Sequence, residues 1–277
     1  MSWLGMGRCV GEGVVFGLGT YAFFWQSSDR VDSPLSLQSM VAITGELGGS
    51  VFQICDYPAV FSMPDDELVA LADYADQLGI RLELGTRGVS VSHLARALRV
   101  AQALRAPLVR SLLFAQNESR SEHSAEQDLL QIIPDFEQAE VLLALETYEQ
   151  VPTERLVSLV ERVGSDWLGI CLDPANSVAA LEKPDEVIER CAPYVRNIHL
   201  KDFAFSRNEG WVGFVLSGAR LGEGLLDVDR VVEVSRTRPG VSIIVEHWLP
   251  WQGDPASTVD MEKRWTDIAV NYLKGLS

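Results

Sequence analysis

Short apolar runs alternate with longer amphipathic segments along nearly the whole chain of 277 residues. The apolar runs predict strands at about 15–23, 51–57, 81–87, 107–114, 142–149, 168–176, 196–203 and 242–248. Each is followed by a segment that can return the chain to a parallel neighbour. Eight strand–helix pairs predict an α/β chain folded as a single (β/α)₈ TIM barrel. A doubly wound open sheet is the alternative, and the absence of GxGxxG after the first strand weakens its dinucleotide-binding form.

The connections between these strands predict helices and one unusual insertion. Helical patterns lie at about 35–47, 63–79, 91–106, 125–140, 152–163, 177–191, 227–237 and 258–274. The stretch 204–226 is too long for an ordinary loop, and at the carboxyl rim of a barrel it is expected to be functional. No linker divides the chain, so 1–277 is expected to form one domain, with 1–13 as a candidate loosely ordered N-terminal extension.

Charge and cysteine usage exclude several classes of function. The formal net charge of −16 and the sequence pI near 4.6 disfavour nucleic acid as a partner, because a phosphate backbone attracts clustered Lys and Arg. No apolar run is long enough to predict a membrane span, and no secretory leader pattern is visible. Four scattered cysteines without CxxC spacing predict free thiols. Together these features predict a cytoplasmic protein.

Four predicted strands in the second half of the chain end in residues that can bind a metal. They are Glu146, Asp173, His199 and Glu246. Side chains alternate faces along a strand, and in each run the polar residue shares its face with small or apolar neighbours. All four side chains are therefore expected to face one cavity. The alternative for any one of them is a carboxylate or a hydrogen-bonded histidine at the rim, with no metal.

The motifs ALETYE, GICLDPANS, NIHLKDF and VEHW around these residues resemble the xylose isomerase-like TIM-barrel superfamily, and LGEGLLD at 221–227 resembles a turn in many of its enzymes. In that family the corresponding Glu, Asp, His and Glu bind one divalent cation, commonly Mn²⁺, with Mg²⁺, Co²⁺ or Zn²⁺ in some members. The resemblance implies that Glu146, Asp173, His199 and Glu246 are metal ligands. Three carboxylates and one imidazole also suit a hard cation better than a thiolate-seeking one.

The resemblance implies a reaction as well. A cation bound to carbonyl and hydroxyl oxygens stabilises the enediolate formed when the neighbouring C–H loses its proton. In family epimerases the first and last glutamates, here Glu146 and Glu246, act as the acid/base pair. The leading hypothesis is therefore a metal-dependent isomerase or epimerase acting on a sugar, cyclitol or related polyhydroxy compound.

Other classes remain as alternatives. The first is a lyase of the same fold, such as a cyclitol or dehydroshikimate dehydratase, or an enzyme that eliminates an aglycone from a 3-keto-glycoside. An endonuclease IV-like phosphodiesterase is disfavoured because the extra His-rich ligands and a basic surface are not visible. A non-catalytic carbohydrate-binding protein is the last alternative. Barrels of this group often pair, so a homo-oligomer is also considered.

Five further residues are candidate substrate contacts: Asn176, Lys201, Arg207, Trp25 and Trp248. Asn176 stands where many family epimerases have histidine, and it is equally a candidate helix N-cap. Lys201 can bind a substrate oxygen or pair with Asp202 or a rim carboxylate. Arg207 is the nearest candidate for a family arginine that is missing from its usual place. The two tryptophans can stack on a sugar ring, although core or interface packing is the commoner fate.

Overall fold

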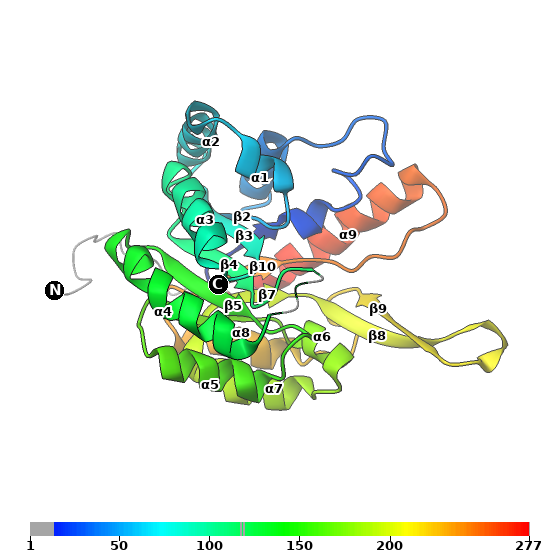
Figure 1. Cartoon of the computed structure of the whole chain (residues 1–277). Coiled ribbons are helices and arrows are strands. Elements are labelled where there is room, and N and C mark those ends of the chain that lie inside the picture. Colours follow the sequence, from blue (N-terminus) through cyan, green and yellow to red (C-terminus); the bar gives the residue numbers. More distant parts are fainter. Residues whose placement is uncertain (1–13, 117, 119, 277) are drawn as a thin grey trace.

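The computed structural model describes residues 14–116, 118 and 120–276, so the predicted extension 1–13 lies outside the described residues. Within them, eight parallel strands close into a barrel in the order β1-β10-β7-β6-β5-β4-β3-β2 (Figure 1). Its strands are β1 Phe16–Gly19, β2 Val51–Ile54, β3 Arg81–Arg87, β4 Leu108–Leu112, β5 Leu142–Glu146, β6 Leu168–Leu172, β7 Val195–Leu200 and β10 Ser242–Val245. The predicted TIM barrel is confirmed.

Helices surround the barrel on its outside (Figure 1). They are α1 Leu37–Glu46, α2 Asp65–Gln77, α3 Val91–Ala103, α4 Glu122–Gln138, α5 Thr153–Val163, α6 Pro174–Ser177, α7 Pro184–Cys191, α8 Val228–Thr237 and α9 Pro255–Lys274. Among the described helices, none combines the length and apolar composition needed to cross a membrane.

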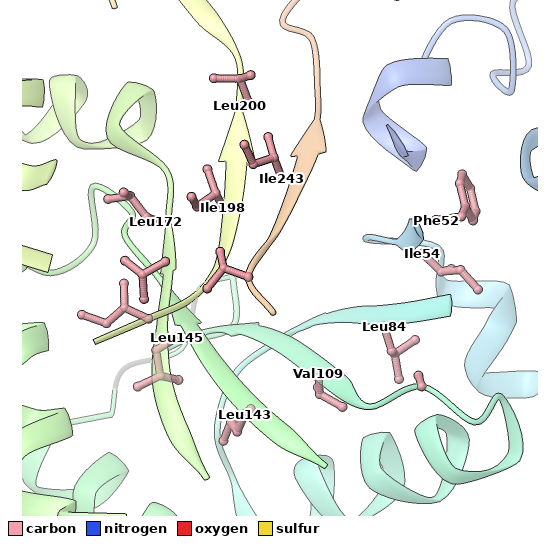
Figure 2. Packing of buried hydrophobic residues seen from close by; sticks show 14 of the residues in the cluster. Phe52, Ile54, Leu84, Val109, Leu143, Leu145, Leu172, Ile198, Leu200 and Ile243 are labelled. Carbon is pink, nitrogen blue, oxygen red and sulfur yellow. The ribbon is translucent and has the colours of Figure 1, made fainter. Parts of the chain in front are cut away.

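The main hydrophobic core lies between the strands and the helices. In β5 the buried Leu143 and Leu145 belong to this core, and Ile198 and Leu200 do the same in β7 (Figure 2). Burial of each such side chain contributes about 1.5–3 kcal/mol. Because strand side chains alternate, the residues between these positions face the barrel interior. The outward layer therefore stabilises the barrel and leaves the inward layer free for polar residues.

Strands β2 and β3 lie close together where Gly85 faces Cys55. A Cβ atom at Gly85 of β3 would lie 2.6 Å from Cys55 Sγ, so no larger residue fits there without displacement. Cys55, Cys171 and Cys191 are buried and free, as predicted, whereas Cys9 lies outside the described residues. The glycine thus allows β3 to lie close to the residue that follows β2.

Several predicted elements differ in their bounds. The first strand ends at Gly19, and the chain continues into the 3₁₀ helix η1, Thr20–Phe23. The helix predicted at 177–191 is interrupted between α6 and α7, where Leu181 has φ of 63° and Pro184 begins a new helix. Proline lacks the backbone N–H that a helix interior needs, which explains the break.

The long connection after β7 forms a hairpin rather than a loop. Its strands are β8 Asp202–Arg207 and β9 Phe214–Ala219, which pair in antiparallel orientation and extend away from the barrel (Figure 1). Asp202 anchors the following turn, because its carboxylate accepts hydrogen bonds from the backbone N–H groups of Gly222, Gly224 and Leu226 at 2.9–3.0 Å. This turn is the LGEGLLD motif, so one carboxylate joins the hairpin to the start of α8.

Candidate active site

The four predicted metal ligands come together at the carboxyl end of the barrel. Glu146 ends β5, His199 lies in β7, and Asp173 and Glu246 directly follow β6 and β10. The Nδ1 atom of His199 lies 3.4 Å from Glu246 Oε1, 3.6 Å from Glu146 Oε1 and 3.8 Å from Asp173 Oδ2. None of the four residues is more than 3 % exposed. Three carboxylates therefore converge on one imidazole nitrogen inside the protein.

The hydrogen bonds of His199 fix its tautomer. Its Nε2 atom lies 2.7 Å from Gln53 Oε1, an atom that can only accept. The amide of Gln53 is oriented by its own Nε2, which donates to Glu83 Oε2 at 3.0 Å and to Asn197 Oδ1 at 2.9 Å. Burial acts to lower the pKa of His199, but the charges of Glu246 and Glu146 raise it. In the neutral imidazole, the bond to Gln53 places the proton on Nε2, and the lone pair on Nδ1 faces the three carboxylates. This is the tautomer that a metal ligand requires.

A buried polar layer below His199 holds this arrangement in place. Asn197 Nδ2 donates to Glu83 Oε2 at 3.1 Å and to Ser242 Oγ at 2.8 Å, and Ser242 Oγ donates to Glu83 Oε1 at 2.7 Å. Together with Gln53, these residues connect β2, β3, β7 and β10 across the barrel. The sequence analysis missed them, although polar residues of inward parity inside apolar strands were a usable signal.

The cluster fits a divalent cation. His199 Nδ1 and Glu246 Oε1 are buried and have no hydrogen-bond partner among the described residues, a costly state for polar atoms. Ligand atoms around a cation with bonds of about 2.0–2.2 Å lie roughly 3–4 Å apart, which matches the separations at Nδ1. Burial, with the charges of Glu146 and Glu246, raises the pKa of Asp173 to about 6 against the opposing charge of Lys201. A bound cation would give both unpartnered atoms a ligand and would lower the pKa of Asp173.

Two protonated cysteine thiols border the cluster. Cys55 lies close enough to His199 and Glu246, and Cys171 to Glu146 and His199, to be considered as ligands. Burial raises the pKa of both thiols well above its ordinary value, so both hold their protons when no metal is bound. Carboxylate oxygens and imidazole nitrogen are the donors that suit a hard divalent cation.

Lys201 reaches into the same cluster. Its Nζ atom donates to Asp173 Oδ2 and, at 2.8 Å, to Glu246 Oε2, and it lies 5.1 Å from the centre of the Trp248 ring. Although burial opposes the charged form, Asp173 and Glu246 hold the pKa of Lys201 well above its ordinary value. Pairing with rim carboxylates, one of the expected alternatives, is therefore what the structure contains, and Asp202 is engaged elsewhere.

Asn176 bridges two of the predicted ligands. Its Nδ2 atom donates to Glu146 Oε1 at 2.6 Å and to Asp173 Oδ2 at 2.9 Å. The N-cap alternative is wrong, because Asp173 caps α6 by accepting a hydrogen bond from the backbone N–H of Asn176 at 3.2 Å. The asparagine therefore fixes the orientation of the two carboxylates.

Arg110 of β4 is the main site residue that the sequence analysis missed. Its guanidinium contacts Glu146 Oε2 and donates from Nη1 to the carbonyl oxygen of Thr86 at 3.0 Å. Burial acts to raise the pKa of Glu146, but the charges of Arg110 and His199 outweigh it and hold that pKa below its ordinary value. Its signal in the sequence was a charged residue in the apolar run LVRSLL.

Two candidate substrate contacts, Arg207 and Trp25, are held by other parts of the chain. Arg207 is exposed near the turn of the hairpin, with its guanidinium 4.2 Å from the centre of the Phe214 ring. Trp25 donates its indole N–H to Leu249 O at 2.8 Å and packs against Trp251, with ring centres 5.2 Å apart. The structure thus groups Asn176, Lys201 and Trp248 with the carboxylates, whereas Arg207 lies on the hairpin and Trp25 contacts the segment that follows β10.

Comparisons with known proteins agree with the barrel fold. The family model described as xylose isomerase-like TIM barrel matches residues 41–268. A 3-oxo-isoapionate decarboxylase from Pectobacterium atrosepticum is 48 % identical over 261 residues, covering 94 % of this chain and 95 % of that protein. A D-psicose 3-epimerase from Clostridium cellulolyticum superposes with a TM-score of 0.72 at 12 % identity, covering 95 % and 99 % of the two chains. A xylose isomerase-like protein from Mycobacterium smegmatis in complex with magnesium gives 0.66 at 14 % identity, covering 97 % and 100 %.

Proposed function

Because the chain belongs to the xylose isomerase-like TIM-barrel family, we propose that it is a metal-dependent decarboxylase of a 3-oxo sugar acid. The observation that carries this proposal is 48 % identity, over nearly the full length of both proteins, to a 3-oxo-isoapionate decarboxylase. We therefore propose 3-oxo-isoapionate as the substrate and Mn²⁺ as the cation. The sequence analysis had considered a lyase, although through loss of water or an aglycone rather than CO₂.

The proposed reaction breaks the bond between the carboxylate carbon and its neighbour. The carboxylate leaves as CO₂, and the electron pair of the broken bond forms an enolate with the 3-oxo group. A proton then adds to the carbon that carried the carboxylate, which gives a ketone. When bound, a divalent cation supplies stabilisation for negative charge on the oxo oxygen. Glu146, Asp173, His199 and Glu246 are the residues that would hold it.

Lys201 is the residue to which we assign the proton transfer. It is buried, carries protons on Nζ, and donates to Glu246 Oε2 at 2.8 Å. The charges of Asp173 and Glu246 keep it protonated between turnovers, and a divalent cation held by these two carboxylates would weaken their hold on Nζ and make it a stronger acid. We therefore propose that Lys201 Nζ delivers one proton to the carbon from which CO₂ has left.

The surroundings of Glu146 support a lyase more than an epimerase. Inversion of a centre needs one group to remove a proton and a second group to return it on the opposite face. Both oxygens of Glu146 are engaged, one by Arg110 and one by Asn176, and its pKa lies below the ordinary value. A residue held ionised in this way is a poor proton carrier. Decarboxylation needs only one proton donor, and the isomerase or epimerase hypothesis stays an untested prediction.

Product analysis in D₂O tests this function. The Mn²⁺-loaded protein is incubated with 3-oxo-isoapionate labelled with ¹³C in the carboxylate, and the products are followed by NMR. We expect one labelled CO₂ per substrate and one deuterium on the carbon that lost it. Recovery of an isomerised acid with its carboxylate intact would reject decarboxylation.

A variant pair tests the proton donor. Lys201→Met should slow turnover by at least about 100-fold, within the usual range for loss of a general acid. Lys183→Met is the control, because Lys183 is exposed on the outer layer and pairs only with Glu186 among its described contacts, at 2.9 Å. An active Lys201→Met variant would remove this residue from the proposed role.

A further inference from the structure

We propose that Arg87 binds the carboxylate of the substrate and thereby selects oxo acids over neutral sugars. This inference rests on the proposed function and adds a specificity-determining residue to it. Arg87 is the last residue of β3, and Asp56 and Tyr21 hold its guanidinium at the rim of the barrel. We call these three residues the rim triad.

The guanidinium of Arg87 is aligned, and one of its nitrogens, Nη1, has no hydrogen-bond partner among the described residues. Its Nε atom donates to Asp56 Oδ1 at 2.8 Å, and Nη2 donates to Asp56 Oδ2 at 2.8 Å and to the Tyr21 hydroxyl oxygen at 3.0 Å. The Tyr21 hydroxyl in turn donates to Asp56 Oδ2 at 2.9 Å. These contacts use Nε and Nη2, which leaves Nη1 for a ligand. The side chain is 36 % exposed, so a solute can reach it. Nη1 can therefore donate one charge-assisted hydrogen bond to a carboxylate oxygen.

The rim triad lies at the same end of the barrel as the metal-ligand cluster. Tyr21, Asp56 and Arg87 follow or end β1, β2 and β3, just as the predicted ligands follow or end β5, β6 and β10. Because all these strands are parallel, their carboxyl ends share one rim. Arg110 of β4 connects the two groups, since its Nη1 atom lies 3.8 Å from Asp56 Oδ1 while its Nε contacts Glu146 Oε2.

The formal charges of the site favour a monoanionic substrate. Three buried carboxylates face two buried cations, Lys201 and Arg110. A divalent cation would convert the resulting single negative charge into a single positive charge. The Asp56–Arg87 pair is neutral in itself and does not alter this balance. Because an uncompensated charge is costly in a low-dielectric site, one bound carboxylate fits better than a neutral sugar.

Backbone geometry shows that the rim triad is held in a fixed position. Asp56 has φ of 48°, in the left-handed region that few residues other than glycine adopt. Cys55, the residue before Asp56, is fixed by Thr20, which follows β1. Thr20 Oγ1 donates to Cys55 O at 2.5 Å and accepts from the Cys55 backbone N–H at 3.0 Å. Such conformations persist where the surrounding contacts over-determine them. The carboxylate that aligns Arg87 is thus set before substrate arrives.

Binding of two inert probes to the Mn²⁺-loaded protein tests the inference by calorimetry. The probes are a four-carbon aldonate and the matching alditol, which differ in one carboxylate. The wild-type protein should bind the aldonate about 30-fold more tightly, as expected for a charge-assisted pair. Arg87→Met should reduce this ratio to within about 3-fold while leaving alditol binding unchanged. Arg87→Lys, which keeps the charge but cannot bond Asp56 through a planar fork while donating to the substrate from a third nitrogen, should give an intermediate ratio.

The control variant is Arg99→Met, which removes an exposed guanidinium that pairs with Asp65 on the outer helices. Its ratio should equal that of the wild type. A ratio near one in the wild type, or an unchanged ratio in both Arg87 variants, would overturn the proposal. Failure of the proposed function has a different outcome, because the wild type would then discriminate between the probes yet release no CO₂ from 3-oxo-isoapionate.

Kinetics supply a second readout on the natural reaction. The carboxylate loses its charge as CO₂ departs, so Arg87 binds the ground state at least as strongly as the transition state. Arg87→Met should therefore raise KM by about 30-fold without lowering kcat. A variant with unchanged KM and a reduced kcat would contradict the assignment.

Discussion

Replacement of Arg110 by methionine should strongly destabilise the metal-free protein. The guanidinium is 3 % exposed, contacts Glu146 Oε2 and donates to Thr86 O at 3.0 Å. Methionine fills much of the same volume, so the main effect is electrostatic. Breaking a buried ion pair from one side costs about 3–5 kcal/mol, because the remaining charge is left without a partner. Loss of the bond to Thr86 O adds about 1 kcal/mol.

The size of this effect should depend on pH. In the wild type, Arg110 and His199 hold the pKa of Glu146 below its ordinary value despite burial. The contribution of the ion pair is therefore present above about pH 4.3 and is lost as pH falls through the lower folded pKa. In Arg110→Met, burial should raise the pKa of Glu146 instead. Protonation of Glu146 in the variant then makes the loss of unfolding free energy smaller at mildly acidic pH.

Urea unfolding of the chelator-treated protein, followed by tryptophan fluorescence and circular dichroism, measures both quantities. We expect the unfolding free energy of Arg110→Met to be lower than that of the wild type by about 4 kcal/mol or more at pH 8, and by less at pH 5.5. Adding Glu146→Gln to Arg110→Met should restore part of the loss, because the unpaired charge disappears. Arg99→Met, which removes an exposed surface pair, should cost about 0–1 kcal/mol. A deficit below about 1 kcal/mol at pH 8, or one independent of pH, would refute this reasoning.

Three further predictions concern other parts of the molecule. Asp202→Ala removes the acceptor for three backbone N–H groups, so limited proteolysis should cut the 220–226 turn faster; an unchanged cleavage rate would contradict its anchoring role. Burial raises the pKa of Glu262 to about 7, more than offsetting two backbone N–H groups that lower it. Stability should therefore fall as pH rises from about 4.3 to 7, and Glu262→Gln should flatten the melting temperature over that range; a persistent slope would assign it to another group. Gly85→Ala places a Cβ 2.6 Å from Cys55 Sγ and should cost about 1–3 kcal/mol by urea unfolding, whereas wild-type stability would show that the strands separate freely.

The predicted metal ligands could be read from the sequence because strands have a period of two. An apolar run that ends in Glu146 or Glu246 determines which face the carboxylate occupies, and parallel strands bring those ends to one rim. The same logic applied to Asp173 and His199. The barrel followed from the regular alternation of strands and helices, which is a local signal.

Side-chain contacts between paired strands could not be read in this way. Arg110 meets Glu146 through the pairing of β4 with β5, and Arg87 meets Asp56 through the pairing of β3 with β2. These partners depend on strand register and on side-chain direction. The hairpin after β7 was not predicted for a different reason: the stretch 204–226 was interpreted as one long loop.

The sequence also left the reaction open, because isomerisation and decarboxylation share an enolate and a cation. The two differ in which group leaves the carbon beside the carbonyl. The structure contributes to this choice through the double engagement of Glu146 and through Asn176, which cannot carry a proton as a histidine would.

The rate of CO₂ release as Mn²⁺ is titrated into the chelator-treated protein tests the central claim most directly. With 3-oxo-isoapionate as substrate, we predict a rate that rises from near zero and saturates at one Mn²⁺ per chain. His199→Gln should not reach that rate at the same metal concentration. Release of CO₂ that is independent of metal, or no release with one Mn²⁺ bound per chain, would contradict the account.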